Sequence, residues 1–363
     1  MRERWLVAMS GGVDSSVAAA LLAREGTEVV GVTMDLGSPL EESTDASSRR
    51  TSRCCGDSEA MDARSVARAL GIRHYVVNYR DAFRRDVVEP FAEAYARGET
   101  PIPCIDCNRM LKFGRLVARA RSLGARGVAT GHYARLAPGP DRGPALYRPR
   151  DRDKDQTYFL FDLPRALLDA VAFPLGELSK SEVRALAREL GLATADKPES
   201  QDICFIPEGD VRPVIHALRP EARRGPGEIV DPQGRRLGTH PGAVGYTVGQ
   251  RRGLGLSGGP WFVRRVEPER NRLVVGRSSD VERDSIDLVR TSWLTPAPPA
   301  GEVCAQVRHR QRATRARLEV HRGERATLHF ERPIRAAAPG QAAVVYDAGD
   351  DRVLGGGWIA DAA

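Results

Sequence analysis

Short apolar runs alternate with stretches of helical periodicity over the first 130 residues of the chain. Runs of four to seven apolar or β-branched residues predict buried strands, and apolar positions three and four apart predict amphipathic helices. Strands and helices that alternate at this length indicate βαβ units, which build a parallel sheet. Residues 37–56, rich in Ser, Thr and Arg, are expected to form a loop. The strands are expected at 5–9, 28–34, 74–77 and 127–130, and the helices at 15–24, 57–70, 81–97 and 108–122.

The pattern changes in the second half of the chain. Helical spacing continues to about residue 210, and Ser179 with Glu182 is typical of a capping box that begins one more helix. Beyond 211, Gly, Pro and short alternating segments dominate, and those from about 285 onward predict a small β-barrel. We therefore expect a parallel α/β domain at 1–210, a small β-rich domain at 211–283 and a C-terminal β-barrel at 284–363.

The string Ser10-Gly11-Gly12-Val13-Asp14-Ser15-Ser16 joins the first predicted strand to the first predicted helix. Two adjacent glycines let the backbone turn its amides towards a ligand, and the helix adds unpaired N–H groups and a positive dipole end. The string lacks the Lys of a Walker P-loop, so it predicts another kind of phosphate site. Asp14 has a use beside an anion only if a magnesium ion lies nearby. A Gly-rich turn with a Ser cap is the alternative, which the strand–loop–helix context disfavours.

The charge balance adds a weaker indication. The chain has 363 residues, enough for two or three domains, and a net charge of +7. Excess positive charge favours a polyanionic partner, because neutralising phosphates releases counterions. A GC-rich genome would explain the dominance of arginine without any function. The four lysines are Lys112, Lys154, Lys180 and Lys197.

The short length of the apolar runs argues against a membrane protein. No apolar run reaches the roughly 20 residues that a membrane span needs. The N-terminal apolar run is also shorter than that of a secretory signal, so we expect a cytoplasmic protein. In that compartment cysteines suggest metal or redox chemistry more than a disulfide framework. The six cysteines are Cys54, Cys55, Cys104, Cys107, Cys204 and Cys304.

Two of these cysteines stand in strings that suggest reactivity. Cys107 precedes the helix expected at 108–122, where the helix dipole, Arg109 and Lys112 would favour its thiolate. Cys204 follows about a hundred residues later, in Ser200-Gln201-Asp202-Ile203-Cys204-Phe205. The remaining thiols, Cys54, Cys55 and Cys304, fit buried and inert cysteines as well as functional ones.

The loop at 10–16 resembles the PP-loop of the N-type ATP pyrophosphatases, which cleave ATP between the α- and β-phosphates and adenylate a carbonyl. The strings around the cysteines resemble, more narrowly, the family of bacterial tRNA-specific 2-thiouridylases (MnmA, also called TrmU). The resemblance runs from residue 8 to residue 357 in the order of the family. Its blocks are 98–101, 107–113, 129–134, 154–160, 197–205, 246–255, 339–341 and 354–357.

The resemblance implies a fold and an activity. The fold would be a PP-loop (adenine nucleotide α-hydrolase-like) parallel-sheet domain, a small central domain and a C-terminal β-barrel that contacts tRNA. The activity would be ATP-dependent 2-thiolation of the wobble uridine of tRNA, with Mg²⁺ as cofactor and with AMP and pyrophosphate released. The tRNAs would be those for Lys, Glu and Gln. The sulfur donor would be a cysteine desulfurase or a sulfur-relay carrier.

The resemblance also implies site residues. Two positions depart from the family pattern: Cys104 replaces the Asp of an Asn-Pro-Asp string, and His309 stands where Tyr is more usual. The ATP site would comprise Ala8, Met9, Ser10, Gly11, Gly12, Val13, Asp14 and Ser15, with Met34 and Gly131 at the adenosine end. The tRNA contacts would comprise Ile102, Pro103, Cys104, His132, Lys154, Asp155, Gln156, Arg308, His309 and Gln341.

Two mechanisms follow for the cysteines. In a persulfide relay, the terminal sulfur on Cys204 attacks the activated carbon, and Cys107 then attacks Cys204, leaving a disulfide. Alternatively Cys107 first frees hydrosulfide. In the second mechanism Cys104, Cys107 and Cys204 bind an iron–sulfur cluster with one open iron. Cys104 could equally be a bystander or a protective disulfide partner.

Two rival functions use other parts of the pattern. A PP-loop enzyme that amidates or ligates a small molecule has no evident need for Cys107 and Cys204. An RNA-binding module with a vestigial nucleotide loop would not release AMP and pyrophosphate in the presence of tRNA. Replacing Cys204 by Ser separates the first rival from a thiolase, and an assay for AMP excludes the second.

Overall fold

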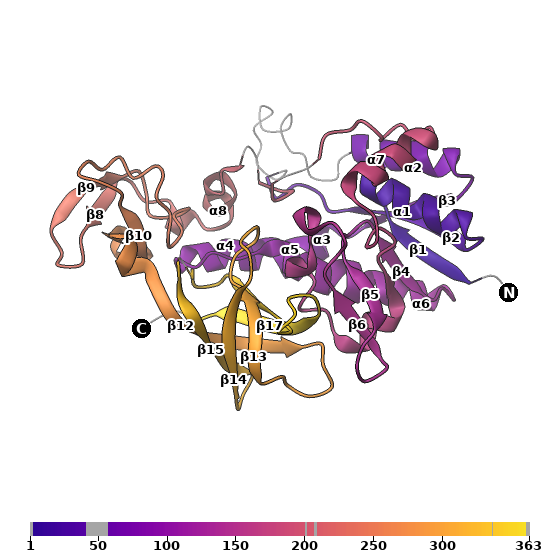
Figure 1. Cartoon of the computed structure of the whole chain (residues 1–363). Coiled ribbons are helices and arrows are strands. Elements are labelled where there is room, and N and C mark those ends of the chain that lie inside the picture. Colours follow the sequence, from indigo (N-terminus) through magenta and orange to yellow (C-terminus); the bar gives the residue numbers. More distant parts are fainter. Residues whose placement is uncertain (1–2, 41–56, 200–201, 207–208, 336, 361–363) are drawn as a thin grey trace.

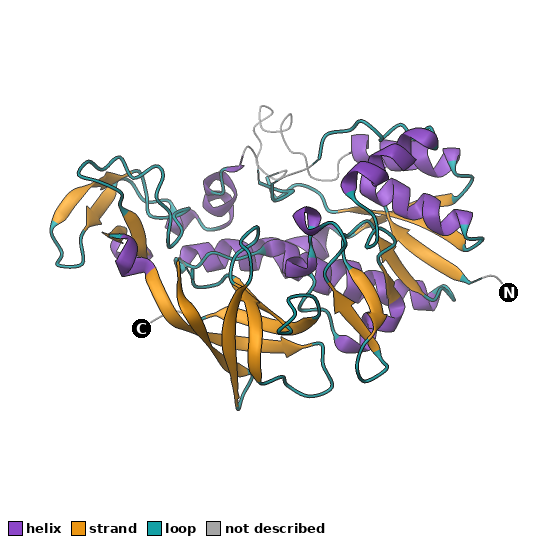
Figure 2. Cartoon of the chain, in the orientation of Figure 1, coloured by secondary structure: helices purple, strands orange, loops and turns teal. Residues whose placement is uncertain are grey.

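The computed structural model describes residues 3–40, 57–199, 202–206, 209–335 and 337–360. An α/β body with a parallel sheet lies at one end of the molecule, a small β-sheet unit lies at the other, and a barrel lies between them, lower in the view (Figures 1 and 2). The fold is therefore α/β, extended by two β-rich parts. Most of the loop expected at 37–56 lies outside the described residues.

The parallel sheet has the strand order β3-β2-β1-β4-β7. Trp5 and Val7 pack with α1, α2 and α7 on one face of the sheet, while Leu6 packs with α6 on the other. The order reverses between β1 and β4, and ligands in such sheets bind at this switch point, outside the carboxyl ends of the strands. The strands are β1 Arg4–Ala8, β2 Glu28–Asp35, β3 Arg73–Asn78, β4 Gly127–Thr130 and β7 Val171–Ala172, and the helices are α1 Val13–Arg24, α2 Asp57–Ala69 and α7 Lys180–Glu189.

A continuous helical run begins earlier than the sequence predicts. The prediction of a helix from 108 was wrong at its start, because the run begins at Pro103. Proline suits the first turn of a helix, where its missing N–H would have no partner in any case. Cys104 and Cys107 thus lie at the beginning of this run. It comprises α5 Pro103–Asp106, η3 Cys107–Arg115 and α6 Leu116–Ser122, and the helix expected at 81–97 comprises α3 Arg80–Phe83, η2 Arg84–Val88 and α4 Glu89–Ala96.

The capping box at the start of α7 is confirmed. The Ser179 side chain accepts a hydrogen bond from the backbone N–H of Glu182, and the Glu182 carboxylate accepts one from the backbone N–H of Ser179. These bonds satisfy two of the N–H groups that a helix leaves unpaired at its start. They also fix Lys180 as the first residue of α7.

Several short elements surround the α/β body, and the hairpin β5–β6 among them was not predicted from the sequence. The hairpin packs between the sheet and the barrel, and its second strand leads to Arg148. Short elements of this kind give little periodic signal. They are β5 Arg135–Pro138, β6 Pro144–Tyr147, η4 Arg152–Lys154, η5 Thr157–Phe159 and η6 Arg165–Ala170.

The two C-terminal parts are a four-stranded sheet in the order β10-β11-β8-β9 and a closed six-stranded barrel, β12-β15-β14-β13-β16-β17. Closure follows from β12, which pairs with both β15 and β17 and so leaves the barrel without an edge. The smaller unit comprises β8 Gly227–Val230, β9 Arg236–His240, β10 Phe262–Glu267, η9 Pro268–Arg270, β11 Arg272–Gly276 and η10 Ser278–Val281. It is preceded by η8 Pro220–Ala222 and by α8 Arg212–Leu218, whose Val214 and Ile215 pack with Phe91 of α4. The barrel comprises β12 Glu282–Trp293, β13 Gly301–Gln306, β14 Thr314–His321, β15 Arg325–Arg335, β16 Ala342–Tyr346 and β17 Val353–Ile359.

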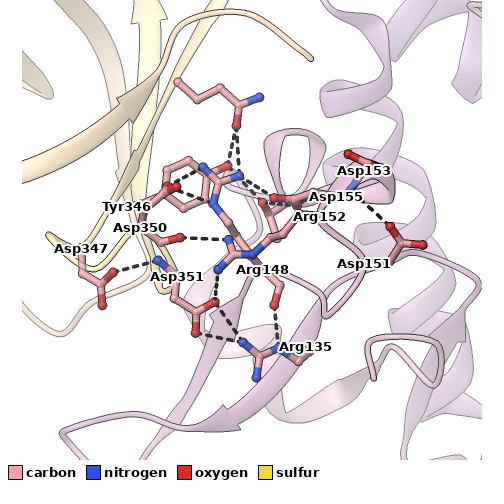
Figure 3. Close-up of polar contacts among 12 residues, drawn as sticks. Arg135, Arg148, Asp151, Arg152, Asp153, Asp155, Tyr346, Asp347, Asp350 and Asp351 are labelled. Atoms are coloured by element: carbon pink, nitrogen blue, oxygen red, sulfur yellow. Dashed lines mark hydrogen bonds and ion pairs between the residues drawn. The ribbon is translucent and has the colours of Figure 1, made fainter. Parts of the chain in front are cut away.

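A buried arginine joins the barrel to the α/β body (Figure 3). Arg148 is 6% exposed, and its guanidinium donates to Asp155 from the α/β body and to Gln306 and Asp350 from the barrel. The guanidinium carbon also lies 3.5 Å from the centre of the Tyr346 ring. Such a desolvated charge is tolerated only when carboxylates and hydrogen bonds surround it.

Within the described residues, no helix is both long and apolar enough to cross a membrane.

Replacing Arg148 by Met should destabilise the protein by about 3–5 kcal/mol, because it leaves the Asp155 carboxylate buried without its cation. Arg152→Met is the matched control, since that exposed arginine pairs with Asp351 at the surface and its loss should cost at most about 1 kcal/mol. Denaturant unfolding followed by circular dichroism measures both. Equal midpoints for the two variants would contradict this role of Arg148.

Candidate active site

A cavity of about 970 Å³ lies at the carboxyl edge of the parallel sheet. The loop at 10–16, the residues after β4 and the segment 202–206 all contribute to its lining. This volume suits a nucleotide-sized ligand, and the position is the expected one for a sheet with this strand order.

Gly11 of the phosphate loop and Gly131, which follows β4 and faces the loop, are required by close backbone contacts. Gly11 has φ +68°, and a Cβ there would lie 2.3 Å from the backbone oxygen of Glu59. A Cβ on Gly131 would lie 2.6 Å from the backbone nitrogen of Ser15. No described side chain caps the N-terminus of α1. Its first backbone amides therefore do not donate to a capping side chain and can bind phosphate.

Asp14 faces a lysine that is distant in the sequence. The Lys180 ammonium donates to both Asp14 oxygens, at 2.7 and 2.8 Å, and the Tyr133 hydroxyl donates to one of them at 2.9 Å. The expectation that Asp14 has a use only beside magnesium was therefore wrong. The same ammonium lies 3.0 Å from Glu199, so a cation is fixed at a loop whose own string contains none.

All four lysines of the chain line this cavity, whereas its lining within the described residues includes no arginine. The Lys154 ammonium donates to Glu199 at 2.8 Å, and the Lys197 ammonium donates to the backbone oxygen of Gly11 and to Asp62. A lysine carries its charge on a compact ammonium, whereas arginine presents a planar fork of donors. Sequence reasoning missed Lys180, Lys197 and Glu199, although the rarity of lysine was a signal that could have found the first two.

Glu199 lies at the centre of a cationic group. Lys154 and Lys180 donate to its carboxylate, and Arg184 lies 3.8 Å away. Burial would raise the pKa of Glu199, but the hydrogen bonds from the two lysines outweigh it and lower the pKa to about 2. This carboxylate therefore stays ionised and holds the segment that begins at Lys197 against the phosphate loop.

Cys104, Cys107 and Cys204 line the same cavity and differ in exposure. Cys107 is buried, Cys104 is half-buried and Cys204 is exposed. Burial raises the pKa of Cys104 to about 12, with Cys204 and Cys107 as further causes. Burial also raises the pKa of Cys107 to about 11, against the lowering effect of Lys112.

The expectation of a favoured thiolate at Cys107 was thus wrong for this state of the protein. Desolvation outweighs the helix start and Lys112, and the Arg109 guanidinium donates to Asp162 at 2.8 Å. Cys304 lies buried on β13 in the barrel, as expected for an inert thiol, and Cys54 and Cys55 lie outside the described residues.

The three cysteines do not form a metal site as they stand. Among the described residues, no group of three or more His, Cys, Asp or Glu side chains is arranged to hold a metal ion. The thiols therefore do not fit the geometry of an iron–sulfur cluster in this structure.

The residues expected to bind ATP gather at the cavity. Gly11 contributes through its backbone oxygen, which accepts from Lys197, while Met34 and Gly131 lie in the cavity wall. The others that line the cavity are Ala8, Met9, Ser10, Gly12, Val13, Asp14 and Ser15.

The tripeptide Lys154, Asp155 and Gln156 makes internal contacts. Asp155 binds Arg148 and the hydroxyl of Thr157, and the Gln156 side chain accepts from the backbone N–H of Tyr133 at 2.9 Å. Lys154 and Gln156 line the cavity, whereas Asp155 links the two domains.

The other residues expected to contact tRNA are divided between the cavity and the barrel. Pro103, Cys104 and His132 line the cavity, and Ile102 packs against the core. His132 shares a hydrogen bond of 2.7 Å with Thr130, and burial lowers its pKa well below the usual value, which keeps the ring neutral.

The barrel residues stand outside the cavity lining. The His309 ring packs against Phe159 at a tilt of 50°, with ring centres 4.5 Å apart, and Arg308 donates to the backbone oxygen of Val248 at 3.4 Å. The buried amide oxygen of Gln341 has no hydrogen-bond partner among the described residues. The structure therefore brings one cluster of predicted residues to the cavity and leaves a second on the barrel.

Alkylation of Cys107 by iodoacetamide should rise about tenfold per pH unit from pH 7 to pH 10 without a plateau, because the raised pKa keeps the thiolate scarce throughout this range. Peptide mass spectrometry of timed samples measures the rate. Lys112→Met should slow the reaction further, since Lys112 lowers this pKa. A plateau near pH 9 would contradict the assigned environment.

Comparisons with known proteins agree along the whole chain. A family model described as the tRNA methyl transferase HUP domain matches residues 3–208, one described as the tRNA methyl transferase PRC-barrel domain matches 216–277, and one described as the aminomethyltransferase beta-barrel domain matches 283–359. A tRNA-specific 2-thiouridylase MnmA of Methylorubrum populi is 51% identical over 365 residues, covering 98% of this chain and 93% of the relative. A protein of the same name from Chloroflexus aurantiacus is 48% identical over 358 residues, covering 98% of each.

A solved 4-thiouridine synthetase in complex with RNA and ATP is 17% identical, with a TM-score of 0.35 over 60% of this chain and 51% of that one, a likeness too slight to carry an argument. The family is shown by the full-length relatives and by the first family model, which spans more than half of the residues. The chain belongs to the tRNA-specific 2-thiouridylase (MnmA) family.

Proposed function

We propose that this chain is an ATP-dependent tRNA 2-thiouridylase that adenylates a uridine and transfers sulfur to it from a cysteine persulfide. The observation that carries the proposal is a single cavity lined both by a phosphate-binding loop and by Cys104, Cys107 and Cys204. Activation of a carbonyl oxygen and delivery of sulfur to the same carbon require both sets of groups in one place.

The loop at 10–16 binds the triphosphate of ATP through the amides at the start of α1. The uridine O2 attacks the α-phosphate, and pyrophosphate leaves. Lys180, 11% exposed and already at the loop, stabilises the charge that develops on the phosphates. Magnesium enters with ATP as part of the substrate, because both Asp14 oxygens already accept hydrogen bonds from Lys180.

The exposed Cys204 receives a persulfide from a sulfur donor of the desulfurase or relay-carrier class. Its terminal sulfur attacks C2 of the adenylated uridine, and AMP leaves. Cys107 then attacks the Cys204 sulfur, the sulfur–sulfur bond breaks, and the thiocarbonyl remains on the base. The reaction leaves a Cys107–Cys204 disulfide, which a dithiol reductant must reset. An iron–sulfur mechanism is not proposed, because the three thiols do not fit a metal site.

The tRNA is held on the face that joins the cavity to the barrel. Lys154 and His132 lie at the cavity, and Arg308 and His309 lie on the barrel side, where the cation suits phosphate and the imidazole suits stacking. We propose the tRNAs for Lys, Glu and Gln as substrates and the cytoplasm as the site of action. We also propose the domain limits 1–210, 211–283 and 284–363.

Incubation of the enzyme with ATP, tRNA and a persulfide donor should convert wobble uridine to 2-thiouridine, measured by nucleoside mass spectrometry. Cys204→Ser should abolish conversion with a persulfide donor, because no thiol remains to carry the sulfur at that position. Cys304→Ser, which changes a buried thiol of the barrel, should retain the parental rate. Formation of 2-thiouridine at the parental rate by Cys204→Ser would contradict the persulfide relay, and absence of 2-thiouridine from the parent would favour the PP-loop ligase.

Lys180→Met should lower the rate of pyrophosphate release by about 10²–10³, the usual effect of removing one charge-stabilising donor. Glu189→Gln provides the control on the same helix, since its exposed pair with Arg24 lies away from the loop. Pyrophosphate release at saturating tRNA measures the step. A change confined to the KM for tRNA would contradict a phosphate contact.

A further inference from the structure

We infer that Cys104 is a resolving thiol, which attacks Cys107 in the Cys107–Cys204 disulfide and returns Cys204 as a thiol. The inference rests on the persulfide relay proposed above and extends it. It gives a role to the cysteine that stands where the resembling family more often has Asp.

The helix start places Cys104 and Cys107 as neighbours. They occupy positions i and i+3 at the beginning of the run from Pro103, where side chains three apart lie on the same face. Cβ atoms three residues apart on a helix lie about 5–6 Å from each other, against about 3.5–4.5 Å in a disulfide, so a local change in the first turn would bring the two sulfurs together. The string Cys104-Ile105-Asp106-Cys107 is the Cys-X-X-Cys pattern of dithiol redox sites.

The three cysteines differ in solvent exposure in a way that suits the exchange. Cys107 is buried, Cys104 is half-buried and Cys204 is exposed, and all three line one cavity. A disulfide between Cys104 and Cys107 would present its more exposed residue, Cys104, to a reductant that enters the cavity. Meanwhile Cys204 would be available for the next persulfide.

The charges around Cys104 change in the direction that the exchange needs. In the reduced protein, burial raises the pKa of Cys104 first, and the charges of Cys204 and Cys107 raise it further. A Cys107–Cys204 disulfide carries neither charge, so two of these causes disappear. Burial and the Asp106 carboxylate still raise the pKa of Cys104, and Lys112 still lowers it, so the disulfide removes only the part of the rise that comes from the two other thiolates.

The exchange balances without an added oxidant. The Cys104 thiolate attacks the Cys107 sulfur, a Cys104–Cys107 bond forms, and the Cys107–Cys204 bond breaks. Cys204 leaves as a thiolate and takes the proton that Cys104 has lost. A dithiol reductant later supplies two electrons to the Cys104–Cys107 disulfide, the same number that direct reduction of the first disulfide would need.

Disulfide mapping after one turnover tests the inference. Enzyme carrying a persulfide is mixed with ATP and tRNA without reductant, quenched with acid and N-ethylmaleimide, and digested with trypsin. Cys104 and Cys107 share the peptide between Arg97 and Arg109, so their disulfide lies within one peptide, whereas a bond to Cys204 joins two peptides. Disulfide yields are expressed per 2-thiouridine formed in the same sample.

The parent enzyme should give the disulfide within one peptide and an alkylated Cys204, and Cys104→Ser should give the joined peptides instead. Cys304→Ser should match the parent. Joined peptides from the parent, with 2-thiouridine formed, would overturn the role of Cys104 and leave the proposed function intact. Absence of 2-thiouridine from the parent would count against the proposed function itself.

A second measurement does not depend on tRNA. One equivalent of an aromatic disulfide reagent forms a mixed disulfide with the exposed Cys204, and Cys107 displaces the aromatic thiol. The bond should then move to Cys104–Cys107 in the parent and remain at Cys107–Cys204 in Cys104→Ser. A bond that remains at Cys107–Cys204 in both proteins would overturn the inference directly.

Discussion

The enclosed charge of Arg148 is the constraint on which the arrangement of the molecule depends. A guanidinium cannot lose its proton, so a domain contact that covers it must supply anions, and Asp155 and Asp350 supply them from opposite sides. The residue after Asp155, Gln156, accepts from the backbone of Tyr133, whose hydroxyl donates to Asp14. The seat of the barrel is thereby connected to the phosphate loop through a short series of polar contacts. The position of the barrel relative to the phosphate loop is built into the same contacts that hold the domains together.

Much of the fold could be predicted from the sequence, because most strands and helices are marked by a local pattern of apolar residues. The four strands predicted in the first 130 residues agree with β1, β2, β3 and β4 to within a residue or two, since each is a short apolar run between turn signals. The helix start was misplaced by five residues, because Pro103 reads as an interruption in a periodic pattern although it suits a first turn. The hairpin β5–β6 was missed, because strands of four residues hardly show a period.

The site divides in the same way. The phosphate loop is one contiguous string, and each cysteine of the cavity stands in a short string of its own, so the sequence shows them directly. The partner of Asp14 is 166 residues away, and that of Lys154 is 45 residues away, so neither contact has a local signature. The thiol environment was misjudged for a related reason: neighbours in the sequence suggested positive charge around Cys107, but burial is set by the packing of distant elements and outweighs it.

The confinement of lysine to the cavity makes this part of the protein chemically distinct from the rest of its surface. Side-chain primary amines occur at four positions, and all four line the same chamber. A reagent that acylates amines and ignores guanidinium groups would therefore label side chains of the active cavity and leave the arginine-covered exterior unmarked. The extent of acylation at each lysine would report whether a ligand occupies that part of the cavity. Amine acylation, which usually labels the surface of a protein, would therefore serve for this chain as a footprinting method for the cavity.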